Sequence, residues 1–465
     1  MLAPFRGVRY AEDRVSGLAE VTSPPYDVIA LDKEDQLMAA DPHNVVRLIL
    51  PRHPAGQPGG KYRDAACALR QWQEEGILVA DPVPALYVYE QVSVGEDASL
   101  APSGSLIQRG LIGALLLAPL DAGIVLPHED VAPGPVRGRR QLMEATQANL
   151  EPIFLLYDGS SPGAAGAPGG GAAIPGGAAT SDGAATPGVA ATPGVAAAIV
   201  EQTAAWREPL VEAHTTDGLR HRLWAITDVT ELAAIAADLS PRQALIADGH
   251  HRYAAYLDLQ NRRHQAGDGP GPWDLGLALM VDSAAYPPWI GAIHRVIPGL
   301  APQQAAELAR AAFCVRALEG GAASLPAALD ELTLAAEKGP AFLVAGGGHA
   351  YLLTDPDPAQ AAAAMPPERS ARWRGLAASV LQELLIERLW GIKDNERSVR
   401  VVHHDAAAAL SAADRVPGGT AVICRPLSAA DVYAVAAQGE RVPRKSTSFR
   451  PKPRTGLVVR TFAQG

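Results

Sequence analysis

The feature that most constrains the fold is the stretch from Ala244 to Ala255, where an apolar run meets a polar turn. Its first four residues are apolar, Asp248 and Gly249 form a sharp break, and a run with repeated alanines follows. We therefore expect a short strand, a turn and a helix, with the Asp248 side chain capping the helix N-terminus. Gly249 lets the backbone adopt an unusual φ angle or approach a ligand closely.

Three basic side chains, His250, His251 and Arg252, stand at the expected helix start. Backbone amides and the helix dipole favour an anion there, so the pattern predicts a phosphate-binding turn. The spacing alone fits a surface turn with solvated basic residues equally well. Adjacent histidines point in different directions on a helix, and no cysteine or further histidine pair stands at metal-ligand spacing. We therefore expect no zinc site.

Strands and helices alternate along the rest of the chain, which predicts an α+β (mixed α/β) fold. Period-2 or β-branched runs predict strands at 45–50, 85–91, 109–117, 152–157, 221–226, 273–281, 291–297 and 420–426, with a hairpin over 341–353. Helical spacing of apolar residues predicts helices at 62–75, 139–149, 199–206, 230–237, 302–312, 323–336, 376–389 and 429–438.

Composition divides the chain into four parts. Residues 159–198 are almost entirely Gly, Ala, Pro, Ser and Thr, with Ala-Thr-Pro-Gly-Val-Ala in tandem at 185–190 and 191–196. Such a segment buries too little apolar surface to offset its ordering entropy, so we interpret it as a flexible insertion. We expect 1–158 to form the N-terminal part of the core, 199–300 to carry the phosphate-binding turn, and 301–465 to form a C-terminal α/β region with a basic tail segment.

Charge and apolar patterning exclude several classes of protein. The formal net charge of −10 argues against a general nucleic-acid binder. Three widely separated cysteines fit a reducing compartment, and the most apolar run, Leu111 to Leu120, is too short to span a bilayer. We expect a soluble, cytoplasmic protein without a membrane partner.

Three further stretches concentrate polar residues. His128, Glu129 and Asp130 follow an apolar run and could supply a general base or metal-binding oxygens, or form a solvated loop. His294 and Arg295 lie inside a predicted strand, one face of which we expect to be solvated.

The third stretch lies in the basic tail segment, where Lys445, Ser446 and Thr447 combine an ammonium group with hydroxyls. That combination can hold phosphate, although a solvated tail is the alternative and the glycine pattern of a P-loop is missing. Together the chain offers one acidic cluster and three sets of phosphate-compatible cations. Phosphoryl transfer requires that balance of charges.

A series of short sequence motifs extends along nearly the whole chain outside 159–198. They are Pro4-Phe5-Arg6-Gly7, Pro24-Pro25-Tyr26-Asp27-Val28, Asp41-Pro42-His43-Asn44, Arg109-Gly110, His128-Glu129, Asn149 with Pro152-Ile153-Phe154, Asp248-Gly249-His250-His251-Arg252-Tyr253, His294-Arg295-Val296, and Pro443-Arg444-Lys445-Ser446-Thr447-Ser448-Phe449 with Pro451-Lys452 and Thr455-Gly456. In these motifs the chain resembles the bacterial and archaeal domain-of-unknown-function family numbered 1015. That family name implies no function by itself.

The turn at Asp248 is also similar, more distantly, to the phosphate-binding turn of the ParB/sulfiredoxin superfamily. The resemblance implies a ParB/sulfiredoxin-like core. The superfamily includes free-serine kinases, nucleotide-hydrolysing partition proteins and sulfiredoxins, and in the serine kinases a glutamate upstream of the turn acts on the substrate hydroxyl. By that resemblance Glu129 is the base candidate, although Val131 stands where the family commonly has threonine. Histidines occupy the position of the sulfiredoxin cysteine, which argues against sulfinic-acid reduction.

The resulting hypothesis is a nucleotide-dependent phosphotransferase acting on a small hydroxylated metabolite, with free L-serine as the first candidate. Its cofactors would be Mg²⁺ and ATP or ADP. We assign catalysis to Glu129 and His128, metal binding to Asp248 and Asp130, and nucleotide or phosphate binding to Asp248, Gly249, His250, His251, Arg252, His294, Arg295, Lys445, Ser446 and Thr447. The alternatives are a ParB-like nucleotide-binding or nucleotide-hydrolysing regulatory module, or a metabolite phosphatase using the same anion site. The oligomeric state stays open.

Overall fold

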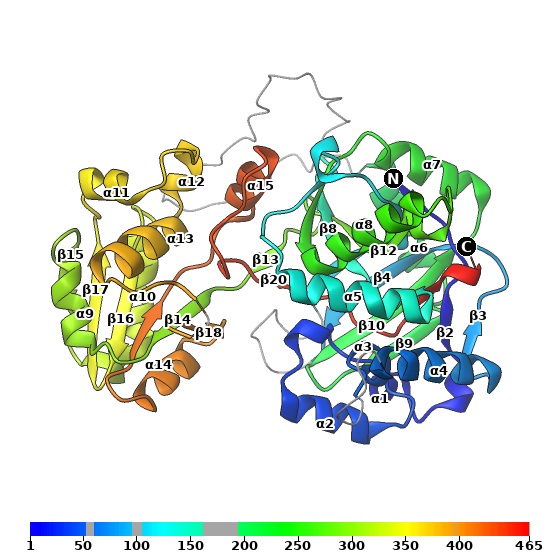
Figure 1. Ribbon diagram of the computed structural model, residues 1–465, viewed down its shortest axis with the longest axis horizontal. Helices are drawn as coiled ribbons and strands as arrows, with labels where there is room; N and C mark the ends of the chain where they lie inside the picture. The colour runs from blue at the N-terminus through cyan, green and yellow to red at the C-terminus, as the bar shows by residue number, and fades with distance from the viewer. Residues whose placement is uncertain (53–59, 95–104, 161–193, 396, 465) are drawn as a thin grey trace. The chain divides into compact units, whose positions relative to one another are not determined.

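The computed structural model describes residues 1–465 except 53–59, 95–104, 161–193, 396 and 465, and it divides into two units (Figure 1). Unit 1 comprises Met1–Leu126, Val131–Pro287 and Pro451–Gly465, and unit 2 comprises Pro127–Asp130 and Pro288–Arg450. The boundaries expected at 158 and 300 coincide with neither unit, because each unit is assembled from segments far apart in the sequence. Most of the expected insertion at 159–198 lies outside the described residues.

Unit 1 contains one large mixed sheet and two small two-stranded sheets among its described residues. Its strands are β1 Leu2–Ala3, β2 Val8–Tyr10, β3 Leu78–Ala80, β4 Leu86–Ser93, β5 Leu106–Leu116, β6 Val125–Leu126, β7 Ala148–Asn149, β8 Ile153–Tyr157, β9 Val211–His214, β10 Leu219–Ile226, β11 Ala244–Asp248, β12 Leu275–Asp282 and β21 Arg460–Thr461. Within the described residues, nine of them form one sheet in the order β6-β11-β8-β12-β5-β4-β10-β9, with β1 beside β5. The pairs β6–β11 and β8–β12 are parallel, and the other pairs of this sheet are antiparallel.

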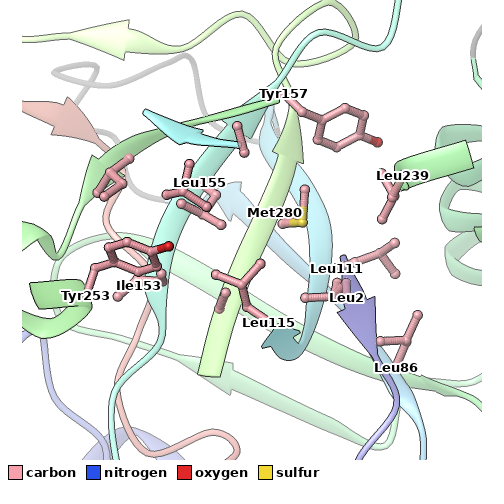
Figure 2. Packing of buried hydrophobic residues seen from close by; sticks show 14 of the residues in the cluster. Leu2, Leu86, Leu111, Leu115, Ile153, Leu155, Tyr157, Leu239, Tyr253 and Met280 are labelled. Atoms are coloured by element: carbon pink, nitrogen blue, oxygen red, sulfur yellow. The ribbon is translucent and has the colours of Figure 1, made fainter. Parts of the chain in front are cut away.

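The helices of unit 1 are α1 Leu18–Val21, α2 Leu31–Ala40, α3 Val46–Ile49, α4 Gly60–Glu74, α5 Pro133–Thr146, α6 Val195–Trp206, α7 Val229–Leu239 and α8 His250–Gln265. One face of the sheet carries an apolar core that includes Ile153, Leu155 and Met280, shown in Figure 2. Leu239 of α7 and Tyr253 of α8 pack into the same core. This burial fixes the start of α8 against the sheet.

Unit 2 holds a second sheet and its own core. Its strands are β13 Trp289–Ile290, β14 Ile293–Ile297, β15 Cys314–Ala317, β16 Phe342–Gly346, β17 His349–Thr354, β18 Arg400–His403, β19 Thr420–Ile423 and β20 Phe449–Arg450. Its helices are α9 Pro302–Ala309, α10 Leu325–Ala336, α11 Pro358–Ala364, α12 Ala371–Gly375, α13 Ala377–Ser379, α14 Ala406–Asp414 and α15 Ala429–Ala437, with a π-helix at Val380–Leu389. A six-stranded sheet runs β15-β17-β16-β19-β14-β18 through the described part of the unit, and the core includes Leu343 and Leu332.

The predicted mixed α+β fold is confirmed, and most predicted elements are present within a few residues of their expected bounds. The strand predicted at 45–50 is wrong, because Val46–Ile49 is helical. The Asn44 side chain accepts a hydrogen bond from the Val46 amide at 2.9 Å, and this local contact starts a helix in spite of the β-branched residues. Among the described residues, we find no helix with the length and apolar character to cross a membrane.

Candidate functional site

The orientation of Asp248 depends on an irregularity in β11. Ile246 lies opposite Leu155, but Asp248 lies opposite Phe154, so the register between β11 and β8 shifts at this point. Directly paired residues share a face of a sheet, and a one-residue shift moves a side chain to the other face. Ile246 therefore faces the helix-covered core with Leu155, whereas Asp248 faces the opposite side.

Two cations bind the Asp248 carboxylate. Arg252 Nη2 donates to Oδ2 at 2.5 Å, and Lys452 Nζ donates to Oδ1. Burial raises the pKa of Asp248, but Lys452 and Arg252 outweigh this effect and the net pKa is lowered, so the carboxylate is ionised. The expected helix cap is wrong: Gly249 is the N-cap, and the Asp248 side chain is held by these cations instead. As a magnesium ligand, Asp248 would have to share its carboxylate oxygens with these two cations.

Gly249 and Arg252 shape the helix start. Gly249 has a φ of 94°, a conformation that favours glycine, and the first helical hydrogen bond joins the Tyr253 amide to its carbonyl at 2.9 Å. A Cβ atom at position 249 would lie 2.9 Å from Ile153 and 3.1 Å from Arg252 Nε. Arg252 donates through Nη1 to the Pro152 carbonyl at 2.6 Å, but its buried Nε has no hydrogen-bond partner among the described residues. A buried N–H donor therefore lies beside the Gly249 turn.

Further charged groups surround Arg252. Burial acts to lower the pKa of Arg252, but Glu151, Asp248 and Asp27 raise it overall. Glu151 is itself buried, which raises its pKa, and it accepts from the Tyr26 amide at 3.0 Å. The guanidinium therefore stays charged inside unit 1.

The two histidines of the turn lie on α8. His250 is buried, and His251 Nε2 accepts a hydrogen bond from the Ala132 amide at 3.0 Å. Ala132 is the N-cap of α5, so His251 connects the starts of α5 and α8. This bond places the lone pair of His251 on Nε2.

Lys452 belongs to this site although the sequence-based assignment left it out, as it left out Asp27 and Glu151. Lys452 Nζ also lies 3.7 Å from Asp27 Oδ2. Burial lowers the pKa of Lys452, but Asp248 and Asp27 raise it overall. Its sequence signals are its place in the basic tail segment and the family motif Pro451-Lys452, and neither indicates that the lysine contacts Asp248.

In unit 2 the structure brings together His128, Glu129 and Thr447, three of the predicted residues. The Thr447 hydroxyl donates to Glu129 Oε1 at 2.9 Å and lies 2.9 Å from His128 Nε2. Because a threonine hydroxyl carries one proton, it accepts from His128 Nε2–H when it donates to Glu129. Both hydrogen bonds then point toward the carboxylate and stabilise its ionised form. Asp130 beside them is exposed.

The neighbouring loop and β14 complete this group. Lys445 is exposed and has a φ of 53°, a strained value for a residue other than glycine, and the Ser446 hydroxyl donates to the Pro443 carbonyl at 2.5 Å. Arg295 donates to the Arg444 carbonyl at 3.0 Å.

The expectation that one face of the His294-Arg295 strand is solvated is wrong, because β14 is buried throughout. His294 Nδ1 accepts from the Cys424 amide at 3.2 Å, and burial lowers the pKa of His294 to about 4. Each side chain thus has a partner within unit 2, while its predicted role at phosphate stays a prediction.

The sequence also allowed the basic tail segment to be a solvated tail, but the structure buries two of its basic side chains. Arg454 is buried and donates to Thr22 Oγ1 at 2.9 Å, and Arg460 is fully buried and donates to Asn149 Oδ1 at 3.0 Å. These contacts integrate the last fifteen residues into unit 1.

Comparisons with known proteins agree with the motifs. The family model described as "Protein of unknown function (DUF1015)" matches residues 2–165 and 188–379, which is well over half of the chain. Similar solved structures include C-terminally truncated SbnI from Staphylococcus aureus, at 11% identity and a TM-score of 0.34 over 75% of this chain and 87% of that chain.

They also include a glutamate-to-alanine mutant of a free serine kinase in complex with ADP, at 11% identity and a TM-score of 0.34 over 74% of this chain and 92% of that chain. A conserved hypothetical protein from Pyrococcus furiosus matches at 14% identity and a TM-score of 0.32, over 74% and 93% of the respective chains. No curated protein matches the chain. On the extent of the family match, the chain belongs to the family of proteins of unknown function DUF1015.

Proposed function

We propose that the protein binds a nucleotide and transfers a phosphoryl group to a small hydroxylated metabolite, with free L-serine the first substrate to test. The observation that carries the proposal is the buried Arg252 Nε, which has no partner among the described residues and lies at the Gly249 turn. An N–H donor on a permanently charged side chain, beside the N-terminus of a sixteen-residue helix, is suited to a phosphate oxygen.

In the proposed reaction the substrate hydroxyl oxygen attacks the terminal phosphorus of ATP or ADP. The bond from phosphorus to the leaving nucleotide oxygen breaks, and Glu129 accepts the hydroxyl proton. Arg252, His250 and His251 are proposed to hold the phosphates. The roles of His294, Arg295, Lys445 and Ser446 at phosphate, and of Asp130 as a magnesium ligand, are retained as predictions. Mg²⁺ would supply charge neutralisation of the phosphates.

The test uses ³¹P NMR of the protein with L-serine and either ATP or ADP in magnesium buffer. We expect phosphoserine to form with the wild type and with Glu368→Gln, an exposed glutamate of unit 2 that serves as the control. Glu129→Gln should abolish transfer while calorimetry shows unchanged ADP binding. Tight nucleotide binding without turnover of any hydroxylated compound would favour a regulatory module. Release of inorganic phosphate from phosphoserine without nucleotide would favour a phosphatase.

A further inference from the structure

The segment that carries Lys452 lies on the face of the unit 1 sheet opposite the helix-covered core. The residues opposite one another across β11, β8, β12, β5 and β4 are Asp248, Phe154, Leu279, Ile112 and Tyr87. Tyr89 and Gln91 continue along β4 on the same face. The Tyr89 hydroxyl accepts from the Arg454 amide at 3.1 Å, and Gln91 Nε2 donates to the Lys452 carbonyl at 3.2 Å.

These contacts fix the backbone of Lys452 on both sides. Gln108 Nε2 donates to the Pro451 carbonyl at 2.9 Å, and prolines at 451 and 453 restrict the local φ angles. The backbone is therefore held while the four-carbon side chain keeps its rotatable bonds. Lys452 Nζ contacts Asp248, the residue that directly precedes the N-cap of α8. Its ammonium group therefore contacts the carboxylate two residues before His250, the first residue of the helix.

Each oxygen of the Asp248 carboxylate binds its own cation. Arg252 alone would pair Asp248, since its Nη2 donates to one carboxylate oxygen at 2.5 Å. Lys452 adds a second full positive charge on the other oxygen. Asp27 is the other carboxylate that contacts this ammonium, at 3.7 Å and a partly exposed position. A phosphate that binds next to Asp248 would therefore have the Lys452 ammonium group as a neighbouring cation.

We propose that Lys452 is a phosphate-binding residue of the α8 turn, whose ammonium group moves from Asp248 to a phosphate oxygen when nucleotide binds. This inference rests on the proposed function only for its ligand, a nucleoside diphosphate or triphosphate. The backbone anchors stay in place, and rotation of the side chain is sufficient for the exchange. Asp248 then keeps Arg252 as its partner, so no carboxylate is left buried and unpaired.

The test is isothermal titration calorimetry of the full chain with ADP in magnesium buffer. Because a charge-assisted hydrogen bond contributes about 1.5–3 kcal/mol, Lys452→Met should weaken ADP binding by roughly tenfold to a hundredfold. Lys33→Met, an exposed lysine of α2 in the same unit, should bind ADP within about twofold of the wild type. Should Lys452→Met fail to fold, Lys452→Met/Asp248→Asn removes both charges of the pair and should also bind ADP more weakly.

Two results would overturn the assignment: either Lys452 variant folds and binds ADP as the wild type does, or Lys445→Met weakens binding while Lys452→Met does not. Failure of the proposed phosphoryl transfer can be distinguished from failure of the Lys452 assignment, because the first is measured by product formation and the second by ADP affinity. Wild-type protein that binds ADP but phosphorylates no hydroxyl compound would contradict phosphoryl transfer, and the Lys452 variants would still support or overturn the binding role. Wild-type protein that binds no ADP would overturn both.

Discussion

Lowering the pH from 7.5 to 5 is expected to destabilise unit 1 through one buried histidine, His221 of β10. Its side chain lies between the Tyr89 hydroxyl, 2.7 Å from Nδ1, and Thr215 Oγ1, 3.0 Å from Nε2. Burial, and secondarily the positive charge of Arg454, lowers the pKa of His221 to about 3, while Asp217 opposes the shift. The folded protein therefore keeps this imidazole neutral at pH values where a solvated histidine is protonated.

The sign and size of the effect follow from proton linkage. Below pH 6.5 the unfolded chain binds a proton on His221 that the folded chain does not bind. The stabilising contribution is thus complete above pH 6.5 and is lost as the pH falls toward 3. The free energy of unfolding decreases by about 1.4 kcal/mol per pH unit in this window, or roughly 2 kcal/mol between pH 7.5 and 5.

Urea unfolding followed by tryptophan fluorescence measures this loss, because the buried Trp224 lies on the same strand. His221→Gln should be less stable than the wild type at pH 7.5 but should lose about 2 kcal/mol less between pH 7.5 and 5. His349→Gln, at an exposed histidine of β17 that does not act on His221, is the control and should keep the wild-type pH dependence. An equal pH dependence in His221→Gln and the wild type would refute the reasoning.

Two further predictions concern the sites. Gly249→Ala should cost about 1–2 kcal/mol for a side chain in the left-handed region and should also weaken ADP binding, because its Cβ would lie 3.1 Å from Arg252 Nε. Gly267→Ala, at a φ of 86° with no atom within 4 Å of the added Cβ, should show only the left-handed cost in urea unfolding and should bind ADP as the wild type does. An equal loss of ADP binding in the two variants would contradict a binding role for the Gly249 turn. Thr447→Val should lower the rate of phosphoryl transfer and leave ADP affinity unchanged if Thr447 positions Glu129, and Thr447→Ser should restore the rate. Weaker ADP binding in Thr447→Val would instead support the predicted phosphate role.

The sequence predicted those features that depend on local chemistry. Apolar runs gave β8 and β12, and helical spacing gave α6 and α7, because burial of one face or stripe imposes a period on the sequence. The turn at Asp248 was predicted from equally local signals, since an apolar run ends at Asp248-Gly249 and a helical pattern follows. The distribution of lysines between the units could not be read in this way, since Lys445 and Lys452 stand seven residues apart in similar basic surroundings. The chain passes from unit 2 to unit 1 between Arg450 and Pro451, and tertiary contacts alone decide on which side each lysine lies.

The face on which Asp248 lies was equally unpredictable, and its cause is the register shift in β11. A regular period of two would place Asp248 on the same face as Ala244 and Ile246, which belong to the apolar core. There its carboxylate would be buried among aliphatic side chains, at a cost of several kcal/mol. The shift costs one irregular pairing near Ala247, and no residue type in this run distinguishes an irregular strand from a regular one. It lets one short strand supply apolar residues to the core and a carboxylate to the opposite face, where Arg252 and Lys452 bind it.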